Sequence, residues 1–151
     1  MTEHLQRGPR ELVDRALELL LAHDMAGFAD LFAVDGVAEF PFAPSGYPQR
    51  LDGRAAVAEY LRDYTDHFDV RAIVGKTVHQ TVDKEVVVLE FEVEGIGVPP
   101  SRPYRMRYIC VITVRGGEIA HYRDYWNPLG AADALGGADR LADFGAAGRS
   151  S

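Results

Sequence analysis

Hydrophobic residues recur at helical spacing in the first third of the chain. Residues 9–21 carry a broad apolar face of leucine, valine and alanine, which predicts an amphipathic helix. Asp24 can cap a second short helix over residues 25–32, and a third helix is predicted over residues 54–67. Between these two helices, residues 37–42 predict a short strand.

Apolar and polar residues alternate in the second half of the chain, as they do along strands. Four strands are predicted, over residues 70–82, 85–94, 102–114 and 118–127. Helices followed by a meander of long strands are typical of an α+β fold, with the helices on one face of a curved antiparallel sheet. We therefore expect a cone-shaped domain over residues 1–128, in which three N-terminal helices enclose a pocket against the sheet. Residues 129–151 form an Ala/Gly-rich C-terminal tail.

The last predicted strand carries an acidic residue on its apolar face. Alternation places Asp124 on the same face as Ala120, Tyr122 and Trp126. A carboxylate on such a face costs free energy unless it is paired, or unless its pKa is raised and the group is used. Asp124 is therefore the predicted catalytic residue, and pairing with Arg105 or another arginine is the structural alternative.

The opposite face of the long strands carries charges of both signs, because glutamates and arginines alternate with apolar residues there. This outer face consists of Glu90, Glu92, Arg105, Arg107, His121, Arg123 and Tyr125. No predicted helix covers it. A twofold contact is self-complementary, and a surface that holds both signs of charge suits such a contact. We therefore expect a homodimer that pairs through the outer sheet face.

Composition excludes several classes of function. The 151 residues carry a net charge of −7 and a pI near 5.1, which argues against nucleic acids and anionic membranes as partners. No apolar run is long enough to span a bilayer, and the single cysteine, Cys110, permits no internal disulfide, which favours the cytoplasm. Cys110 lies in an apolar strand and is expected to be a small core residue. No Cys or His spacing predicts a metal site and no glycine-rich turn opens a helix, so no cofactor is expected.

Four segments of the chain resemble a known superfamily. They lie at residues 20–28, 31–37, 51–57 and 122–128, the last with the sequence YRDYWNP. They are similar to the nuclear transport factor 2-like superfamily, which includes ketosteroid isomerase, limonene epoxide hydrolase, SnoaL-type polyketide cyclases and the phenazine-biosynthesis A/B proteins. The resemblance covers residues 12–129 and implies the same cone-shaped fold. It does not select a reaction, because this fold hosts isomerases, hydrolases, cyclases and plain binding proteins.

Known catalytic positions of the superfamily transfer to this chain only in part. The resemblance places the general base of ketosteroid isomerase on Phe40, and its two oxyanion-hole residues near Ala16 and Cys110, so none of the three is retained. Asp124 matches the last aspartate of limonene epoxide hydrolase, but the Arg-x-Asp pair of that enzyme falls on apolar residues here. In the comparison with the phenazine A/B proteins, Asp124 stands where their acid/base glutamate stands, which is the closest functional match.

The remaining candidates are aromatic and apolar residues that can line a pocket around Asp124. The predicted ligand-binding residues are Phe40, Phe42, Tyr60, Tyr64, Met106, Tyr108, Tyr122 and Trp126. The tyrosines are favoured because a buried phenol needs a partner and can offer its hydroxyl to a ligand. His67, near the end of the third predicted helix, is a second and weaker catalytic candidate. Phe32, Val57 and Phe91 are expected to be core residues.

Two functions from different classes remain open. In the first, the protein is a cofactor-independent enzyme on a hydrophobic metabolite, and Asp124 moves a proton in an isomerisation, cyclisation or dehydration. In the second, it is a non-catalytic binding protein for an apolar small molecule, and Asp124 only anchors a ligand hydroxyl or an arginine.

Overall fold

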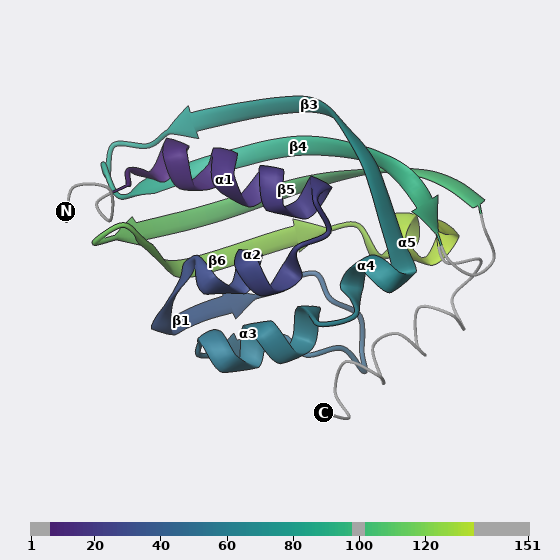
Figure 1. Ribbon diagram of the computed structural model, residues 1–151, viewed down its shortest axis with the longest axis horizontal. Coiled ribbons are helices and arrows are strands. Elements are labelled where there is room, and N and C mark those ends of the chain that lie inside the picture. The colour runs from purple at the N-terminus through teal and green to yellow at the C-terminus, as the bar shows by residue number, and fades with distance from the viewer. Residues whose placement is uncertain (1–6, 98–101, 135–151) are drawn as a thin grey trace.

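The chain folds around one strongly curved, six-stranded sheet (Figure 1). This computed structural model describes residues 7–97 and 102–134. The strand order is β2-β1-β6-β5-β4-β3, and the sheet is not closed into a barrel. The strands are β1 (Phe32–Glu39), β2 (Arg50–Asp52), β3 (Phe68–Gln80), β4 (Val86–Gly97), β5 (Arg102–Arg115) and β6 (Glu118–Trp126). The predicted α+β class is confirmed.

Four helices precede the long strands and a fifth follows the last strand. They are α1 (Pro9–Leu21), α2 (Met25–Asp30), α3 (Arg54–Leu61), α4 (Tyr64–His67) and α5 (Pro128–Ala134). At the start of α1, the Glu11 carboxylate accepts a hydrogen bond from the Gly8 backbone N–H at 3.3 Å. Asp24 caps α2 by accepting from the Gly27 N–H at 2.8 Å, as the sequence predicted. Both helices lie across the concave face of the sheet (Figure 1).

The structure corrects three predicted element boundaries. Phe32 begins β1 instead of ending α2, because the Leu31 carbonyl accepts a hydrogen bond from the Ile119 N–H at 2.9 Å and joins the chain to the sheet. The third predicted helix is divided into α3 and α4, since Asp63 leaves helical geometry with φ −113° and ψ 16°. The short strand β2 is additional, and it pairs with β1.

The pairing of β1 with β6 is parallel, whereas the other described strand pairs are antiparallel. The sheet is thus antiparallel as predicted, apart from this one parallel pair. No hairpin joins the two strands, because the β3–β4–β5 meander lies between them in the sequence. The register places Ala38 beside Tyr122, so β1 forms the wall next to the strand that carries Asp124.

Irregular pairing bends the long strands into the curved shape that encloses the interior. The register between β3 and β4 shifts between Val70 and Ala72, and again between Ile73 and Gly75. Such bulges bend and twist a strand locally. Gly95 allows the two strands to approach closely at this end, because a Cβ atom there would lie 2.3 Å from the Asp69 carbonyl oxygen.

The convex face of the sheet is the predicted outer face, and its charges of opposite sign form ion pairs between neighbouring strands. The Arg105 Nε atom lies 3.4 Å from Glu92 Oε2, and the same guanidinium also pairs with Glu94. Ile109 lies on this face with 44% of its surface exposed. Figure 1 shows the helices on the other side of the sheet. The homodimer through this face stays a prediction.

The last helix crosses the predicted boundary between domain and tail. Ala131 of α5 is buried at 2% exposure and belongs to the core. The rest of the predicted tail, residues 135–151, lies outside the described residues. Among the helices of the described residues, none is long and apolar enough to cross a membrane.

Candidate active site

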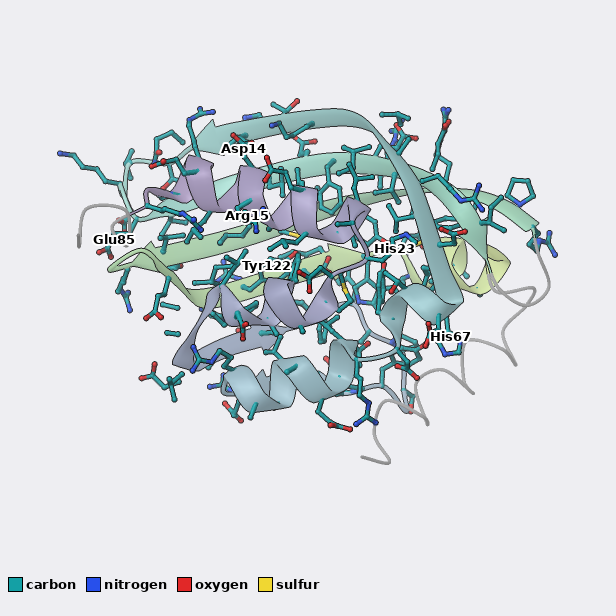
Figure 2. The ribbon with its side chains drawn as sticks, viewed as in Figure 1. Asp14, Arg15, His23, His67, Glu85 and Tyr122 are labelled. Carbon is teal, nitrogen blue, oxygen red and sulfur yellow. The ribbon has the colours of Figure 1, made fainter. Side chains whose placement is uncertain are left out.

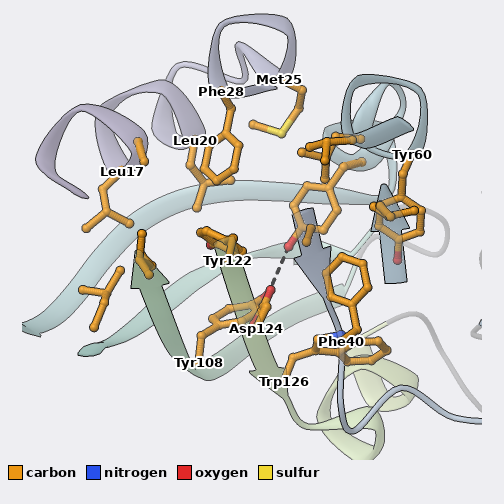
Figure 3. A pocket seen from close by; sticks show the side chains of 18 of the residues that line it. Leu17, Leu20, Met25, Phe28, Phe40, Tyr60, Tyr108, Tyr122, Asp124 and Trp126 are labelled. Atoms are coloured by element: carbon orange, nitrogen blue, oxygen red, sulfur yellow. Dashed lines mark hydrogen bonds between the residues drawn. The ribbon is translucent and has the colours of Figure 1, made fainter. Parts of the chain in front are cut away.

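A cavity of about 110 Å³ lies between the helices and the concave face of the sheet (Figure 3). Helices α1 and α2 contribute aliphatic side chains such as Leu17, Leu20 and Met25, and the strands contribute aromatic rings. Among the described residues that line the cavity, Asp124 is the one with an Asp, Glu, His, Lys or Arg side chain. A dry apolar cavity of about 150 Å³ is large enough to bind benzene. The cavity is smaller than this, so it limits a ligand to about the size of one six-membered ring at most.

Most of the predicted ligand-binding residues line this cavity. They are Phe40, Tyr60, Tyr64, Met106, Tyr108, Tyr122 and Trp126. The structure corrects the placement of Phe42, which is 61% exposed and packs edge-on against Tyr125 at 5.2 Å between ring centroids. The alternation of inward and outward side chains predicted for residues 37–42 ends at Phe40, because the Phe40 carbonyl accepts a turn hydrogen bond from the Ala43 N–H. The turn directs Phe42 to the convex side of the sheet.

Asp124 projects from β6 into the cavity, beside Tyr122, Tyr108 and Trp126 (Figure 3). Its Oδ1 atom is buried and has no hydrogen-bond partner among the described residues. The residue as a whole is half-buried, and it lines the cavity. Burial among apolar groups raises the pKa of Asp124 to about 7, and no cation contributes to the shift. The carboxyl group is therefore able to take up or release a proton near neutral pH.

Cys110 is the polar neighbour of Asp124 on the adjacent strand. The two residues are directly opposite in the β5–β6 register, and the thiol is fully buried. The thiol donates a hydrogen bond to the Tyr122 hydroxyl, with sulfur and oxygen 3.3 Å apart. The thiol also lies close enough to Asp124 to lower the pKa of that carboxyl group, against the larger effect of burial. Cys110 lies in the core, as predicted, but its contact with the acid could not be read from its own apolar strand.

Two tyrosine hydroxyls meet inside the cavity. The Tyr64 and Tyr108 oxygens are 3.1 Å apart, and the Tyr108 hydroxyl also donates to the Met106 sulfur at 3.7 Å. Burial raises the pKa of both phenols above its ordinary value, so both stay protonated at neutral pH. Each ring is also fixed by stacking, Tyr64 on Phe68 and Tyr108 on Phe91. The cavity thus holds a rigid pair of hydrogen-bonding groups in addition to the acid.

His67 lies at the end of α4 and is not among the residues that line the cavity (Figure 2). Its Nε2 atom is 3.7 Å from the Asp63 carboxylate. Figure 2 shows it well away from Tyr122, which marks the interior. The structure therefore does not bring this second candidate together with Asp124.

Sequence reasoning missed Tyr47, which lines the cavity and packs against Trp126 at 5.4 Å between ring centroids. Tyr47 lies in a segment rich in Pro, Gly and Ser, a composition that predicts an exposed loop. It is nevertheless 6% exposed. The one available signal was an aromatic residue within an otherwise polar loop.

The described residues contain no group of three or more His, Cys, Asp or Glu side chains that could hold a metal ion. The side chains that line the cavity suit an organic ligand, with one acid and several hydroxyl groups in an apolar wall.

A family model described as a SnoaL-like domain matches residues 13–122. The chain belongs to the SnoaL-like domain family. The match covers most of the cavity wall and ends before Asp124, so membership alone assigns no role to this residue. The resemblance to the nuclear transport factor 2-like superfamily is confirmed together with the fold.

Relatives in two bacteria cover nearly the same length. The uncharacterized protein YesE of Bacillus subtilis is 38% identical over 127 residues, which are 84% of this chain and 86% of YesE. An uncharacterized PhzA/B-like protein of Pseudomonas aeruginosa is 35% identical over 133 residues, 88% of this chain and 94% of that protein. A crystal structure from Bacillus subtilis, of a protein provisionally named an isomerase, aligns with a TM-score of 0.82 at 35% identity. The alignment covers 91% of this chain and 97% of that one.

Proposed function

We propose that the protein is a cofactor-independent enzyme that moves a proton within a small hydrophobic metabolite, with Asp124 as the acid/base group. One observation carries this proposal. An enclosed carboxyl group with an unpartnered Oδ1 atom and a pKa of about 7 lies in an otherwise apolar cavity. An acid with a pKa near the working pH is well suited to both halves of a proton transfer.

The surroundings of Asp124 favour proton abstraction from carbon. In the charged form the carboxylate is poorly solvated, and it is therefore a stronger base than an aspartate in water. A C–H bond next to a carbonyl group can give up its proton to such a base when a hydrogen-bond donor stabilises the negative charge that develops on the carbonyl oxygen. Asp124 then returns the proton to another carbon or to a leaving oxygen, which gives isomerisation or dehydration respectively. If the carbanion instead attacks a second carbonyl group, a ring closes, and Asp124 protonates the new alkoxide.

The relatives are consistent with this reaction class. The name of the Bacillus subtilis structure refers to an isomerase, and that of the Pseudomonas aeruginosa relative to the phenazine A/B proteins. Both proteins share more than 30% of their residues with this chain. The names support a small-molecule reaction without selecting a substrate.

A non-catalytic binding protein is the second candidate function. The almost wholly apolar wall favours it, because such a wall binds a ligand without any need for proton transfer. In that case Asp124 would only hydrogen-bond a ligand hydroxyl.

Deuterium exchange separates the two candidates without knowledge of the natural substrate. Cyclohexanone and 2-cyclohexenone are single-ring ketones that carry acidic C–H bonds. The wild-type protein in D₂O is expected to speed deuterium incorporation into a ketone that it binds, as followed by NMR. The Asp124→Asn variant should lose on the order of a hundredfold in exchange rate while binding the ketone within about tenfold. Ketone binding with no exchange above buffer would favour the binding protein.

A further inference from the structure

We infer that the Tyr64–Tyr108 hydroxyl pair binds the oxygen atom of the ligand, so that the ligand is a single-ring or similarly small molecule with one carbonyl oxygen. The inference deepens the proposed function and rests on the same cavity. It concerns a polar subsite on β5 and α4, separate from the Asp124 carboxyl group on β6.

Tyr108 donates its hydroxyl proton to a weak acceptor in the structure. Its hydroxyl donates to the Met106 thioether sulfur at 3.7 Å. A thioether is a weak acceptor, and a carbonyl oxygen is a much better one. A ligand carbonyl that enters the cavity would therefore replace the sulfur as the acceptor of the Tyr108 proton. Both Met106 and Tyr108 line the cavity, so the exchange needs no change in the fold.

The Tyr64 hydroxyl strengthens Tyr108 as a hydrogen-bond donor. The two phenol oxygens are 3.1 Å apart. When Tyr64 donates to the Tyr108 oxygen, the hydrogen bonds of a chain polarise one another and Tyr108 becomes a stronger donor. Stacking holds the rings in place: the Tyr108 and Phe91 centroids are 4.8 Å apart, with 13° between the ring planes. A donor that is fixed before the ligand arrives loses little entropy on binding.

Tyr108 and Asp124 lie close enough in the sheet to contact the same small ligand. Tyr108 pairs with Trp126 and Cys110 pairs with Asp124, so Tyr108 and Asp124 are diagonal neighbours on the inner face of adjacent strands. The backbones of diagonal neighbours in a sheet lie roughly 7–8 Å apart, and the side chains of both residues line the same cavity. A small ring can bridge such a span, with its carbonyl oxygen at Tyr108 and the neighbouring C–H at Asp124. A hydrocarbon of the same size would leave the donor without a better acceptor than sulfur.

Infrared spectroscopy of a bound ketone tests this inference directly, with 2-cyclohexenone as the probe and cyclohexene as the matched hydrocarbon. The C=O stretching band should move to lower frequency on binding to the wild-type protein. In the Tyr108→Phe variant the band should return toward its position in an apolar solvent, and the affinity for the ketone should fall about tenfold. The affinity for cyclohexene should stay within about twofold of wild type. Tyr64→Phe should return the band only part of the way toward its position in an apolar solvent. This variant tests the inference if Tyr108→Phe does not fold.

The controls separate this inference from the proposed function. Tyr125→Phe removes a tyrosine hydroxyl from the outer sheet face, away from the cavity, and should leave the carbonyl band unchanged. Asp124→Asn should keep the band at its wild-type frequency while it abolishes deuterium exchange. A lowered band without exchange in the wild-type protein would contradict the enzyme and leave the oxygen subsite in place. The same band in wild type and Tyr108→Phe, or no preference for the ketone over cyclohexene in the wild-type protein, would overturn the inference.

Discussion

The substitution Asp124→Asn should change the way in which stability depends on pH. The pKa of Asp124 rises from 3.8 to about 7 on folding, because the folded protein buries the carboxyl group. Between these two values the folded protein binds more protons than the unfolded chain, so this residue makes the free energy of unfolding fall as the pH rises. The full cost of the charge is on the order of 4 kcal/mol, at about 1.4 kcal/mol for each pH unit between the two values. Asparagine has the same shape and carries no such cost.

The difference in free energy of unfolding between the variant and the wild type isolates this effect, because all other groups titrate in both proteins. Between pH 5 and pH 8 the difference should move in favour of Asp124→Asn by on the order of 2–3 kcal/mol, and it should level off at higher pH. Urea denaturation followed by the fluorescence of Trp126, the single tryptophan, gives the two free energies. The exposed Asp35 provides a matched Asp35→Asn control for the chemistry of the substitution.

A difference that stays constant from pH 5 to pH 8 would refute this reasoning. It would mean that Asp124 is solvated or paired in solution and pays no cost for its charge. A shared loss of stability at every pH would indicate that the side chain has only a packing role.

Two further predictions concern the neighbour of the acid and the outer sheet face. Cys110→Val removes the thiol with little change in volume, and it should raise the pKa of Asp124 above about 7. Cys110→Ser should keep the pKa of Asp124 near the wild-type value. An NMR titration of the two variants checks this, and an unchanged pKa in Cys110→Val would rule out the thiol contact. We also propose that a second copy of the chain covers the outer sheet face, where Ile109 is 44% exposed beside ion-paired charges. Sedimentation should give a dimer at micromolar concentration, and Ile109→Lys should shift it toward monomer; a wild-type monomer at that concentration would count against the proposed contact.

Strong hydrophobic periodicity made much of the fold predictable from the sequence. The long strands β4, β5 and β6 alternate over nine or more residues, and the structure places them within a few residues of the predicted ranges. Short segments were less predictable, because a few apolar residues fit a helix and a strand equally well. Phe32 illustrates this, since a backbone hydrogen bond to a strand more than 80 residues away decides its conformation.

The candidate site was likewise predictable from the sequence only in part. The position of Asp124 on an apolar face follows from the alternation of its own strand, so the anomaly was visible in the sequence. Its thiol neighbour and the hydroxyl pair depend on which strands adjoin and in which register, and a single strand carries no such information. Phe42 was misplaced for a related reason, because alternation cannot show where a strand ends and a turn reverses the side chains.

The most direct test of the account is a carbon-13 NMR titration of the Asp124 carboxyl group, assigned by comparison with Asp124→Asn. The central claim is that this acid is enclosed in an apolar cavity and exchanges its proton near neutral pH. The account predicts a carboxyl resonance that titrates with a pKa of about 7 and that is missing from the variant spectrum. A midpoint near the ordinary aspartate value of 3.8 would contradict it.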